Sequence, residues 1–226
     1  MVALPTFSAT LVALVETASP PVTPASWDER CIAINDASHR IFAELGVWPQ
    51  MSAAATPITA THISERGRFG VARFSAEAAG LPALGYNIPI RHVGQVLWRA
   101  MQDTATELIC PARLQSLTMD EGQVLLGLAD GRQLSTRLVV AADGAQSVVR
   151  SLLGLGAETH DYQQSAIVTA VRPSRPHQGI AYERFTPDGP FAVLPKPENG
   201  CSLVWTVPTA KVEGLLACPE ADFLNA

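Results

Sequence analysis

Two kinds of strand pattern alternate along this chain, and their order limits the folds it can adopt. The run "TLVALVET" (Thr10 to Thr17) is continuously apolar and ends in an acid, which is typical of a strand buried on both faces of a parallel sheet. Residues 58–90 and 165–208 instead alternate between apolar and polar side chains and contain Gly, Pro and Asn, which indicates antiparallel strands. The chain therefore leaves one domain, enters another and returns.

Three segments between these strands have helical spacing. "NDASHRIFAELGVW" has Asn35 or Asp36 as its N-cap and Gly46 as its stop. Its predicted apolar face is Ile41, Phe42 and Leu45. "HVGQVLWRAMQD" places four apolar side chains on one side: Val93, Val96, Leu97 and Met101. "SVVRSLLG" is a short helix that follows the strand-like run "LVVAADG" (Leu138 to Gly144), and we expect that run to be buried.

Composition and charge exclude several classes of protein. A hydrophobic content of 47% supports a packed core, and a net charge of −5 argues against a nucleic-acid binder. The four cysteines form no CxxC pair, so we expect no metal site and ordinary reduced thiols of a cytoplasmic protein. No apolar run reaches the roughly 18 residues that span a bilayer, and the N-terminus lacks the basic region of a signal peptide.

Glu16 is the first candidate for chemistry. An acid at the end of a buried parallel strand is where dinucleotide-binding folds hold ribose hydroxyls. The alternative is an ordinary solvated strand end. The glycine-rich fingerprint that accompanies such an acid is missing, since the 15 residues before Glu16 contain no glycine. "GLGAET" (Gly154 to Thr159) follows a helix and lacks the third glycine, so it is no substitute.

Arg30 and the segment "LVVAADGAQSVVR" supply further candidates. Arg30 stands shortly before an amphipathic helix, and its guanidinium suits phosphate. Asp143 and Gly144 follow a strand, where ligands of open α/β sheets gather. Ser147 is placed to cap the next helix, and Arg150 to bind phosphate or pair with Asp143. The alternatives are a surface arginine and a common strand-to-helix turn.

The order of these pieces resembles one family. An acid-ended strand, "WDERCIAI", "HVGQVL", "CPARL" and "ADGAQSVVR" follow one another as in the flavin-dependent aromatic hydroxylases of the p-hydroxybenzoate hydroxylase type. "AYERFTPDGPFAVLP" and "CSLVW" are most similar to the ubiquinone-biosynthesis subgroup, especially the 2-polyprenyl-6-methoxyphenol hydroxylases. The resemblance runs from about Leu11 to the end of the chain.

The resemblance implies a fold and a division into domains. It implies a mixed α/β (α+β) fold in which a partial Rossmann-like FAD-binding domain is interleaved with an antiparallel β-sheet substrate domain. Residues 1–57 and 91–160 would form the FAD-binding domain, and residues 58–90 and 161–226 the substrate domain.

The resemblance also implies a role for particular residues. Glu16 would hold the ribose of the adenosine half of FAD, and Leu114 would present its backbone to the adenine. Arg30 would lie near the ribityl or pyrophosphate portion, and Gln95 would face the cofactor. Asp143 and Gly144 would serve FAD and NAD(P)H, supported by Arg150. No catalytic residue is assigned. Phe185 and Trp205 are aromatic candidates for the substrate ring, with core packing as the alternative role.

The family chemistry uses NAD(P)H, FAD and O2 to hydroxylate a phenol, while the protein positions the ring and excludes water. The implied substrate is a prenylated phenol in ubiquinone biosynthesis or another aromatic molecule. Such an apolar substrate implies peripheral contact with the membrane, and a multi-enzyme complex for ubiquinone synthesis is the further partner implied. Nucleic acid is not an expected partner.

Two family elements have no counterpart in the sequence. These are the first strand with its glycine-rich turn, and a late Gly-Asp segment. We therefore expect the chain to be truncated at both ends relative to the family, and residues 1–10 match no part of it. A non-catalytic remnant or assembly subunit of the same fold remains the alternative function.

Overall fold

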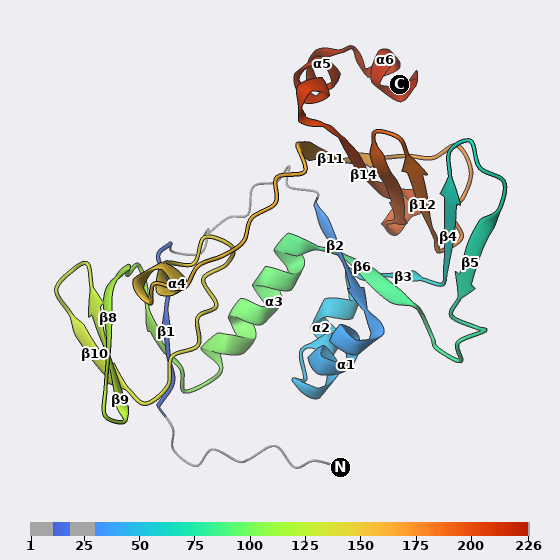
Figure 1. Ribbon diagram of the computed structural model, residues 1–226. Helices are drawn as coiled ribbons and strands as arrows, with labels where there is room; N and C mark the ends of the chain where they lie inside the picture. Colours follow the sequence, from blue (N-terminus) through green and yellow to red (C-terminus); the bar gives the residue numbers. More distant parts are fainter. Residues whose placement is uncertain (1–10, 19–29, 226) are drawn as a thin grey trace. The chain divides into compact units, whose positions relative to one another are not determined.

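The computed structural model describes residues 11–18 and 30–225, which fall into two compact units (Figure 1). The first unit contains residues 11–18 and 101–160, and the second contains residues 30–100 and 161–225. Both units contain helices and strands, so the mixed α/β class predicted from the sequence is confirmed.

The first unit is built around a short parallel pair and an antiparallel sheet. Strand β1 (Ala13–Val15) pairs in parallel with β7 (Glu107–Ile109). Strands β8 (Leu114–Asp120), β9 (Gln123–Leu128) and β10 (Gln133–Thr136) form an antiparallel sheet, with turns at "DEG" and "DG" between them. The core consists of Ile109, Ala112 and Leu128, with Val15, Leu114 and Leu134 packed against it.

Two apolar runs of this unit are not buried as predicted. In the first run Leu11 is 93% exposed and Val12 54%, because only one edge of β1 has a neighbouring strand among the described residues. In "LVVAA" Leu138 is 75% exposed and Val140 78%, and residues 138–142 form no strand. A strand requires a hydrogen-bonded neighbour, and no described strand pairs with this segment.

The second unit contains a six-stranded sheet in the order β11-β14-β13-β12-β4-β5. Its strands are β4 (Ala60–Glu65), β5 (Val71–Ser75), β11 (Gln164–Val171), β12 (Ile180–Thr186), β13 (Gly189–Pro195) and β14 (Cys201–Pro208). All neighbouring pairs are antiparallel except β12 with β4. The antiparallel character predicted for both segments of the sequence is confirmed.

A smaller antiparallel sheet in the order β2-β6-β3 belongs to the same unit. Its strands are β2 (Cys31–Asn35), β6 (Gly85–Pro89) and β3 (Thr56–Ile58). Asn87 on β6 is 2% exposed, and its Nδ2 donates to the carbonyl oxygen of Pro195, at 2.9 Å, and to Oγ of Ser202, at 3.4 Å. One buried amide therefore fastens the small sheet to β13 and β14.

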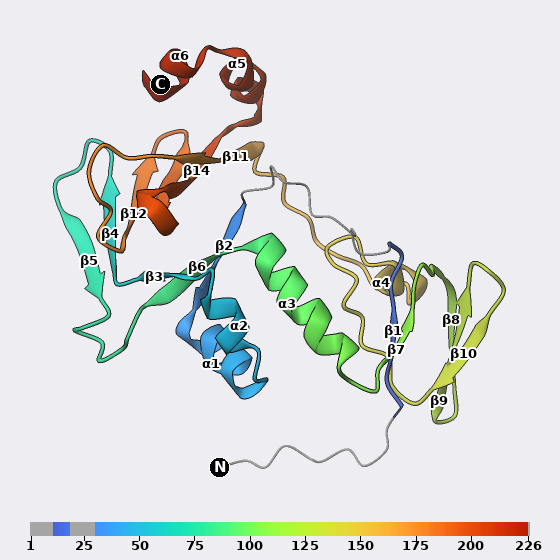
Figure 2. The ribbon, with the colours of Figure 1, turned by 180° about the vertical axis from the view of Figure 1, so that it is seen from behind.

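Three helices accompany the small sheet (Figures 1 and 2). They are α1 (Asp36–Glu44), α2 (Trp48–Ser52) and α3 (Ile90–Gln102). The predicted N-cap is confirmed, since Oδ1 of Asn35 accepts from the backbone N–H of Ser38 at 2.9 Å. Val47, Met51 and Val96 are buried together, with Phe42, Trp48, Val93 and Ala100 packed around them.

The predicted apolar face of α1 is only partly correct. Phe42 packs into the helical core, whereas Ile41 is 57% exposed and Leu45 64%. On α3, Val93 and Val96 pack into the same core, but Leu97 is 38% exposed. Helical spacing identified the helices but overestimated the width of the faces they bury.

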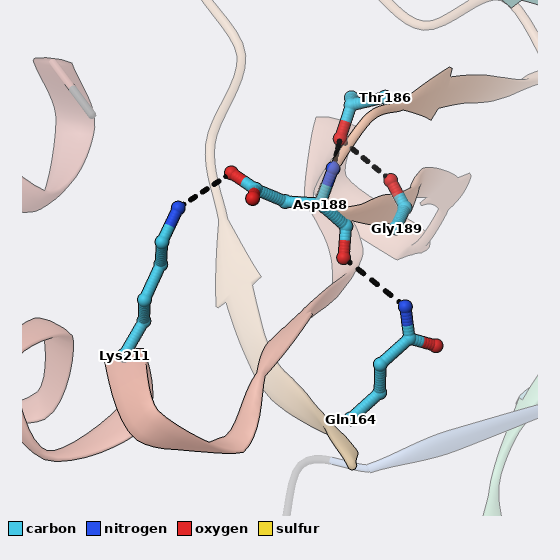
Figure 3. A network of polar contacts seen from close by, with 5 residues as sticks. All are labelled: Gln164, Thr186, Asp188, Gly189 and Lys211. Atoms are coloured by element: carbon cyan, nitrogen blue, oxygen red, sulfur yellow. Dashed lines mark hydrogen bonds and ion pairs between the residues drawn. The ribbon is translucent and has the colours of Figure 1, made fainter. Parts of the chain in front are cut away.

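A polar network closes the turn between β12 and β13 (Figure 3). Oγ1 of Thr186 donates to the carbonyl oxygen of Gly189 at 2.7 Å and accepts from the Asp188 N–H at 3.3 Å. Gln164 donates to the Asp188 carbonyl oxygen at 3.2 Å, and Nζ of Lys211 lies 2.8 Å from the Asp188 carboxylate. This turn is therefore fastened to the start of β11 and to the 3-10 turn η2 (Thr209–Lys211).

The end of the chain forms two short helices, α5 (Val212–Ala217) and α6 (Glu220–Asn225). Phe223 of α6 lies against Trp205 of β14, with ring centroids 5.5 Å apart, and Phe191 lies on Trp205 at 6.0 Å. Trp205 therefore packs among aromatic neighbours, while Phe185 remains 48% exposed on β12. No disulfide is formed by the four cysteines, all of which lie within the described residues.

Candidate functional site

Glu16 lies where β1 ends, on a backbone held to the residues after β7. Its N–H donates to the carbonyl oxygen of Ile109 at 3.1 Å, and its own carbonyl oxygen accepts from Ala112 at 2.8 Å. Oε1 accepts from the Ala18 N–H at 3.0 Å and from Oγ1 of Thr17 at 3.1 Å. These bonds, the one from Ala18 first, lower the pKa of Glu16. The result is an exposed, ionised carboxylate at a fixed strand end, able to accept from hydroxyl groups.

A cavity of about 700 Å³ lies beside Glu16 in the same unit. Its lining residues come from the segment after β1, the segment after β7, the β9–β10 turn and α4: Thr17, Pro111, Ala112, Arg113, Ala129, Asp130 and Val148. It is a shallow depression that is largely open to solvent. Leu114 follows this lining directly and turns its side chain into the core, which leaves its backbone as the part able to contact a ligand.

The segment "ADGAQSVVR" forms a tightly bonded turn into α4 (Val148–Leu152). Oδ2 of Asp143 accepts from the N–H groups of Val148 and Val149 at 2.7 and 3.1 Å, and Oδ1 accepts from the Ser147 hydroxyl at 2.5 Å. The bond from Ser147 contributes most to lowering the pKa of Asp143. Ser147 in turn accepts from the Arg150 N–H at 3.0 Å, which confirms the predicted cap.

Gly144 and Arg150 also serve this turn. Gly144 has φ of +80°, a conformation that side chains with a Cβ rarely adopt. The guanidinium of Arg150 donates to the carbonyl oxygen of Ala145 at 2.7 Å. No ion pair joins it to Asp143, whose carboxylate accepts from the helix N-terminus and Ser147.

The predicted site residues divide between the two units. Five belong to the first unit: Glu16, Leu114, Asp143, Gly144 and Arg150. Arg30 and Gln95 belong to the second. Arg30 directly precedes strand β2, and its carbonyl oxygen accepts from the N–H of Ile90 at 3.0 Å, at the first residue of α3. Gln95 is exposed on α3.

The sequence did not identify the remaining lining of the cavity. Asp130 lies in the β9–β10 turn and pairs with Arg132 at 2.6 Å. Hydrogen bonds from Arg132 lower the pKa of Asp130. "ADGR" has the pattern of an ordinary hairpin turn, so no local signal distinguishes it. Its place beside Thr17 arises from tertiary structure alone.

The sequence matches the FAD binding domain family over residues 12–214. The chain belongs to this family. FAD, predicted from the order of motifs, is therefore confirmed as the cofactor of the family. No group of three or more His, Cys, Asp or Glu side chains able to hold a metal occurs within residues 11–18 and 30–225.

Two curated relatives come from ubiquinone metabolism. The chain is 40% identical over 201 residues to ubiquinone hydroxylase UbiL of Rhodospirillum rubrum, covering 88% of this chain and 46% of that protein. It is 33% identical over 211 residues to 3-demethoxyubiquinol 3-hydroxylase of Escherichia coli, covering 92% and 54%. The predicted resemblance to the ubiquinone subgroup is confirmed. The chain spans about half the length of these relatives.

The solved structures support the fold. PqsL, described as a probable FAD-dependent monooxygenase from Pseudomonas aeruginosa, superposes with a TM-score of 0.75 at 20% identity. The match covers 94% of this chain and 58% of that one. At this identity the likeness shows the fold alone. Within the described residues, no helix is both long and apolar enough to span a bilayer.

Proposed function

We propose that this chain belongs to a FAD-dependent monooxygenase that hydroxylates a prenylated phenol in ubiquinone biosynthesis, with NAD(P)H and O2 as co-substrates. The observation that carries the proposal is the 40% identity to ubiquinone hydroxylase UbiL over 88% of this chain. The E. coli relative, whose name specifies a ubiquinol-type substrate, supports the same substrate class.

The first unit fits the adenosine half of FAD. The ionised Glu16 carboxylate would accept from the ribose hydroxyls, as acids at parallel strand ends do. The neighbouring 700 Å³ cavity would take the adenine, with the Leu114 backbone at its edge. FAD would supply the oxygen activation, and the protein would hold the cofactor and keep water away from the phenol.

The other assignments follow the family pattern. Asp143, Gly144 and Arg150 would line the FAD and NAD(P)H site, and Arg30 and Gln95 would approach the flavin half of the cofactor. We propose residues 1–57 and 91–160 as the FAD-binding domain, and residues 58–90 and 161–226 as the substrate domain. All six strands of the large sheet fall within the second set, which favours the division, whereas the small sheet β2-β6-β3 takes strands from both sets.

We also propose where such a protein would act. A prenylated phenol is very apolar and partitions into the bilayer, so the enzyme would work from the cytoplasm and contact the membrane surface to collect its substrate. A complex with other enzymes of ubiquinone synthesis would pass such substrates on without release into water.

One observation favours a second function for the chain by itself. Residues 138–142 lie next to Asp143 yet form no strand and expose Leu138 and Val140. Residues 138–142 thus lead into a proposed cofactor contact without pairing in a sheet, which fits a non-catalytic remnant or assembly subunit of the same fold.

FAD titration separates the two functions. The purified chain should take up added FAD and acquire flavin absorbance near about 370 and 450 nm. Glu16→Ala should weaken FAD binding about tenfold, because it removes charged hydrogen bonds to the ribose. Glu121→Ala, in the exposed β8–β9 turn, is the matched control and should bind like the wild type. A chain that takes up no FAD would contradict the first function and support the second.

Turnover tests the substrate class. NADH or NADPH oxidation with a prenylated phenol should yield a product with one added oxygen atom by mass spectrometry. The same phenol without its prenyl chain is the control and should be hydroxylated more slowly. Equal rates for both would count against a quinone precursor.

A further inference from the structure

The turn between β4 and β5 is fixed at its base and open at its tip. The N–H of Arg66 donates to the carbonyl oxygen of Phe185 on β12 at 2.8 Å. The N–H of Arg68 closes the turn on the carbonyl oxygen of Glu65 at 3.3 Å. Strand β5 is the last strand of the six-stranded sheet, so β4 is its one neighbour among the described strands (Figure 1). Every residue from Glu65 to Phe74 is exposed, so this hairpin presents its tip to the surroundings.

Apolar side chains of this hairpin face the solvent. Phe69 at the tip is 108% exposed, the highest value among the large apolar side chains of the described residues. Val71 and Phe74 on β5 are 54% and 56% exposed. Val71 lies opposite Ser64 and Phe74 opposite Thr61 in the pairing with β4, so the two project from opposite faces of the sheet. The hairpin therefore exposes apolar groups at its tip and on both faces.

The same turn concentrates positive charge. Arg66, Arg68 and Arg73 fall within eight residues, and no other stretch of eight residues in the sequence holds three Lys or Arg. Glu65 is the single acid among residues 64–75, whereas the whole chain has a net charge of −5. Arg68 lies 3.3 Å from Glu65, but both side chains are more than half exposed, so this pair contributes little and is easily exchanged. A basic tip with an exposed phenyl ring is thus a local exception in an acidic chain.

We propose that the β4–β5 hairpin binds the surface of an anionic lipid bilayer. The guanidinium groups of Arg66 and Arg68 bind lipid phosphates, and the ring of Phe69 enters the boundary between headgroups and acyl chains. Arginine suits this depth, because its aliphatic stem can lie along apolar groups while its charge stays at the phosphates. A specific protein interface takes roughly 20–30 residues on each side. The short exposed tip is much smaller than that, which favours a lipid surface over a protein partner.

The inference rests on the proposed function for its purpose, since an enzyme that hydroxylates a prenylated phenol collects its substrate from a bilayer. The hairpin belongs to the second unit, whereas Glu16 and Asp143, proposed to contact FAD, belong to the first. Vesicle binding is measured without FAD or phenol. Failure of vesicle binding and failure of FAD uptake are therefore separate results.

Co-sedimentation of the full chain with lipid vesicles tests the proposal. The chain should bind vesicles of two parts phosphatidylcholine and one part phosphatidylglycerol about tenfold more tightly than phosphatidylcholine alone, and added salt should weaken this binding. Phe69→Ser should lower the affinity about tenfold through loss of the inserted ring. Phe69→Trp should retain it, because indole rings suit the membrane interface. Arg66→Gln combined with Arg68→Gln should lower it about twentyfold, since each arginine is attracted to the anionic surface.

Two control variants remove the same groups from exposed positions outside the hairpin. Arg172→Gln combined with Arg175→Gln removes two charges between β11 and β12, and Tyr162→Ser removes a ring that is 81% exposed. Both controls should bind vesicles like the wild type. Wild-type chain that binds neither kind of vesicle, or both equally, would overturn the proposal, as would hairpin variants that bind like the controls. Self-association without vesicles that Phe69→Ser abolishes would identify a second copy as the occupant instead.

Discussion

The buried side-chain amide of Asn87 joins the small sheet of the second unit to the large sheet. Replacing Asn87 by alanine removes the donor to the Pro195 carbonyl oxygen and to Ser202. Pro195 is fully buried and Ser202 is 4% exposed, so water does not replace the lost donor. A buried acceptor left without its partner costs about 1–3 kcal/mol. The space left by the amide adds about 1 kcal/mol, which gives a loss of about 2–4 kcal/mol in the free energy of unfolding.

Urea unfolding followed by tryptophan fluorescence measures this loss, since Trp48 and Trp205 belong to the same unit as Asn87. The matched control is Asn225→Ala. Its amide donates to the carbonyl oxygen of Ala221 on the exposed helix α6, and its removal should change stability by less than about 0.5 kcal/mol. If Asn87→Ala changed the free energy of unfolding no more than this control does, the buried amide would not fasten the two sheets.

Two further predictions concern backbone geometry and pH. Gly189→Ala should destabilise the protein by about 2 kcal/mol or more, because φ is +143° and the added Cβ would lie 2.8 Å from the Thr206 carbonyl oxygen. Gly156→Ala meets open space and is its control in urea unfolding; equal stability of the two variants would refute the reasoning. The pKa of Asp143 is lower in the folded protein than in the unfolded chain, where it is about 3.9, so ionised Asp143 stabilises the fold. This contribution to the free energy of unfolding is fully present above pH of about 3.9 and is lost as the pH falls through the lower pKa of the folded state. In Asp143→Asn the free energy of unfolding should therefore fall less steeply between neutral and acid pH than in the wild type. The same pH dependence in both proteins would contradict this prediction.

The sequence predicted the elements whose signals are local. Asn35 caps α1 and Ser147 caps α4 as expected, because a capping side chain bonds to N–H groups only three residues away. The antiparallel strands of residues 58–90 and 165–208 were likewise found from their alternation. These features depend little on the rest of the fold.

Burial could not be predicted in the same way. The runs at residues 10–17 and 138–142 are apolar enough for buried strands, yet both expose large side chains. Whether an apolar strand is covered depends on its neighbours in the sheet, and these are set by residues distant in sequence. Tyr182 beside His62 is a similar case, since 120 residues separate them and no motif connects them.

The turn at Asp143 shows that a structural and a functional interpretation can both hold. A carboxylate offers about four lone-pair positions, and Asp143 uses three: one on Oδ1 for Ser147 and two on Oδ2 for the N–H groups of α4. Oδ1 therefore keeps one position for a ribose hydroxyl or a bridging water. The bonds to Ser147 and α4 fix the direction of that position, because they hold the carboxylate in a single orientation. The hydrogen bonds that cap α4 would therefore also hold the Asp143 carboxylate in position for a cofactor. The strand-to-helix turn is in this way part of the site that we propose.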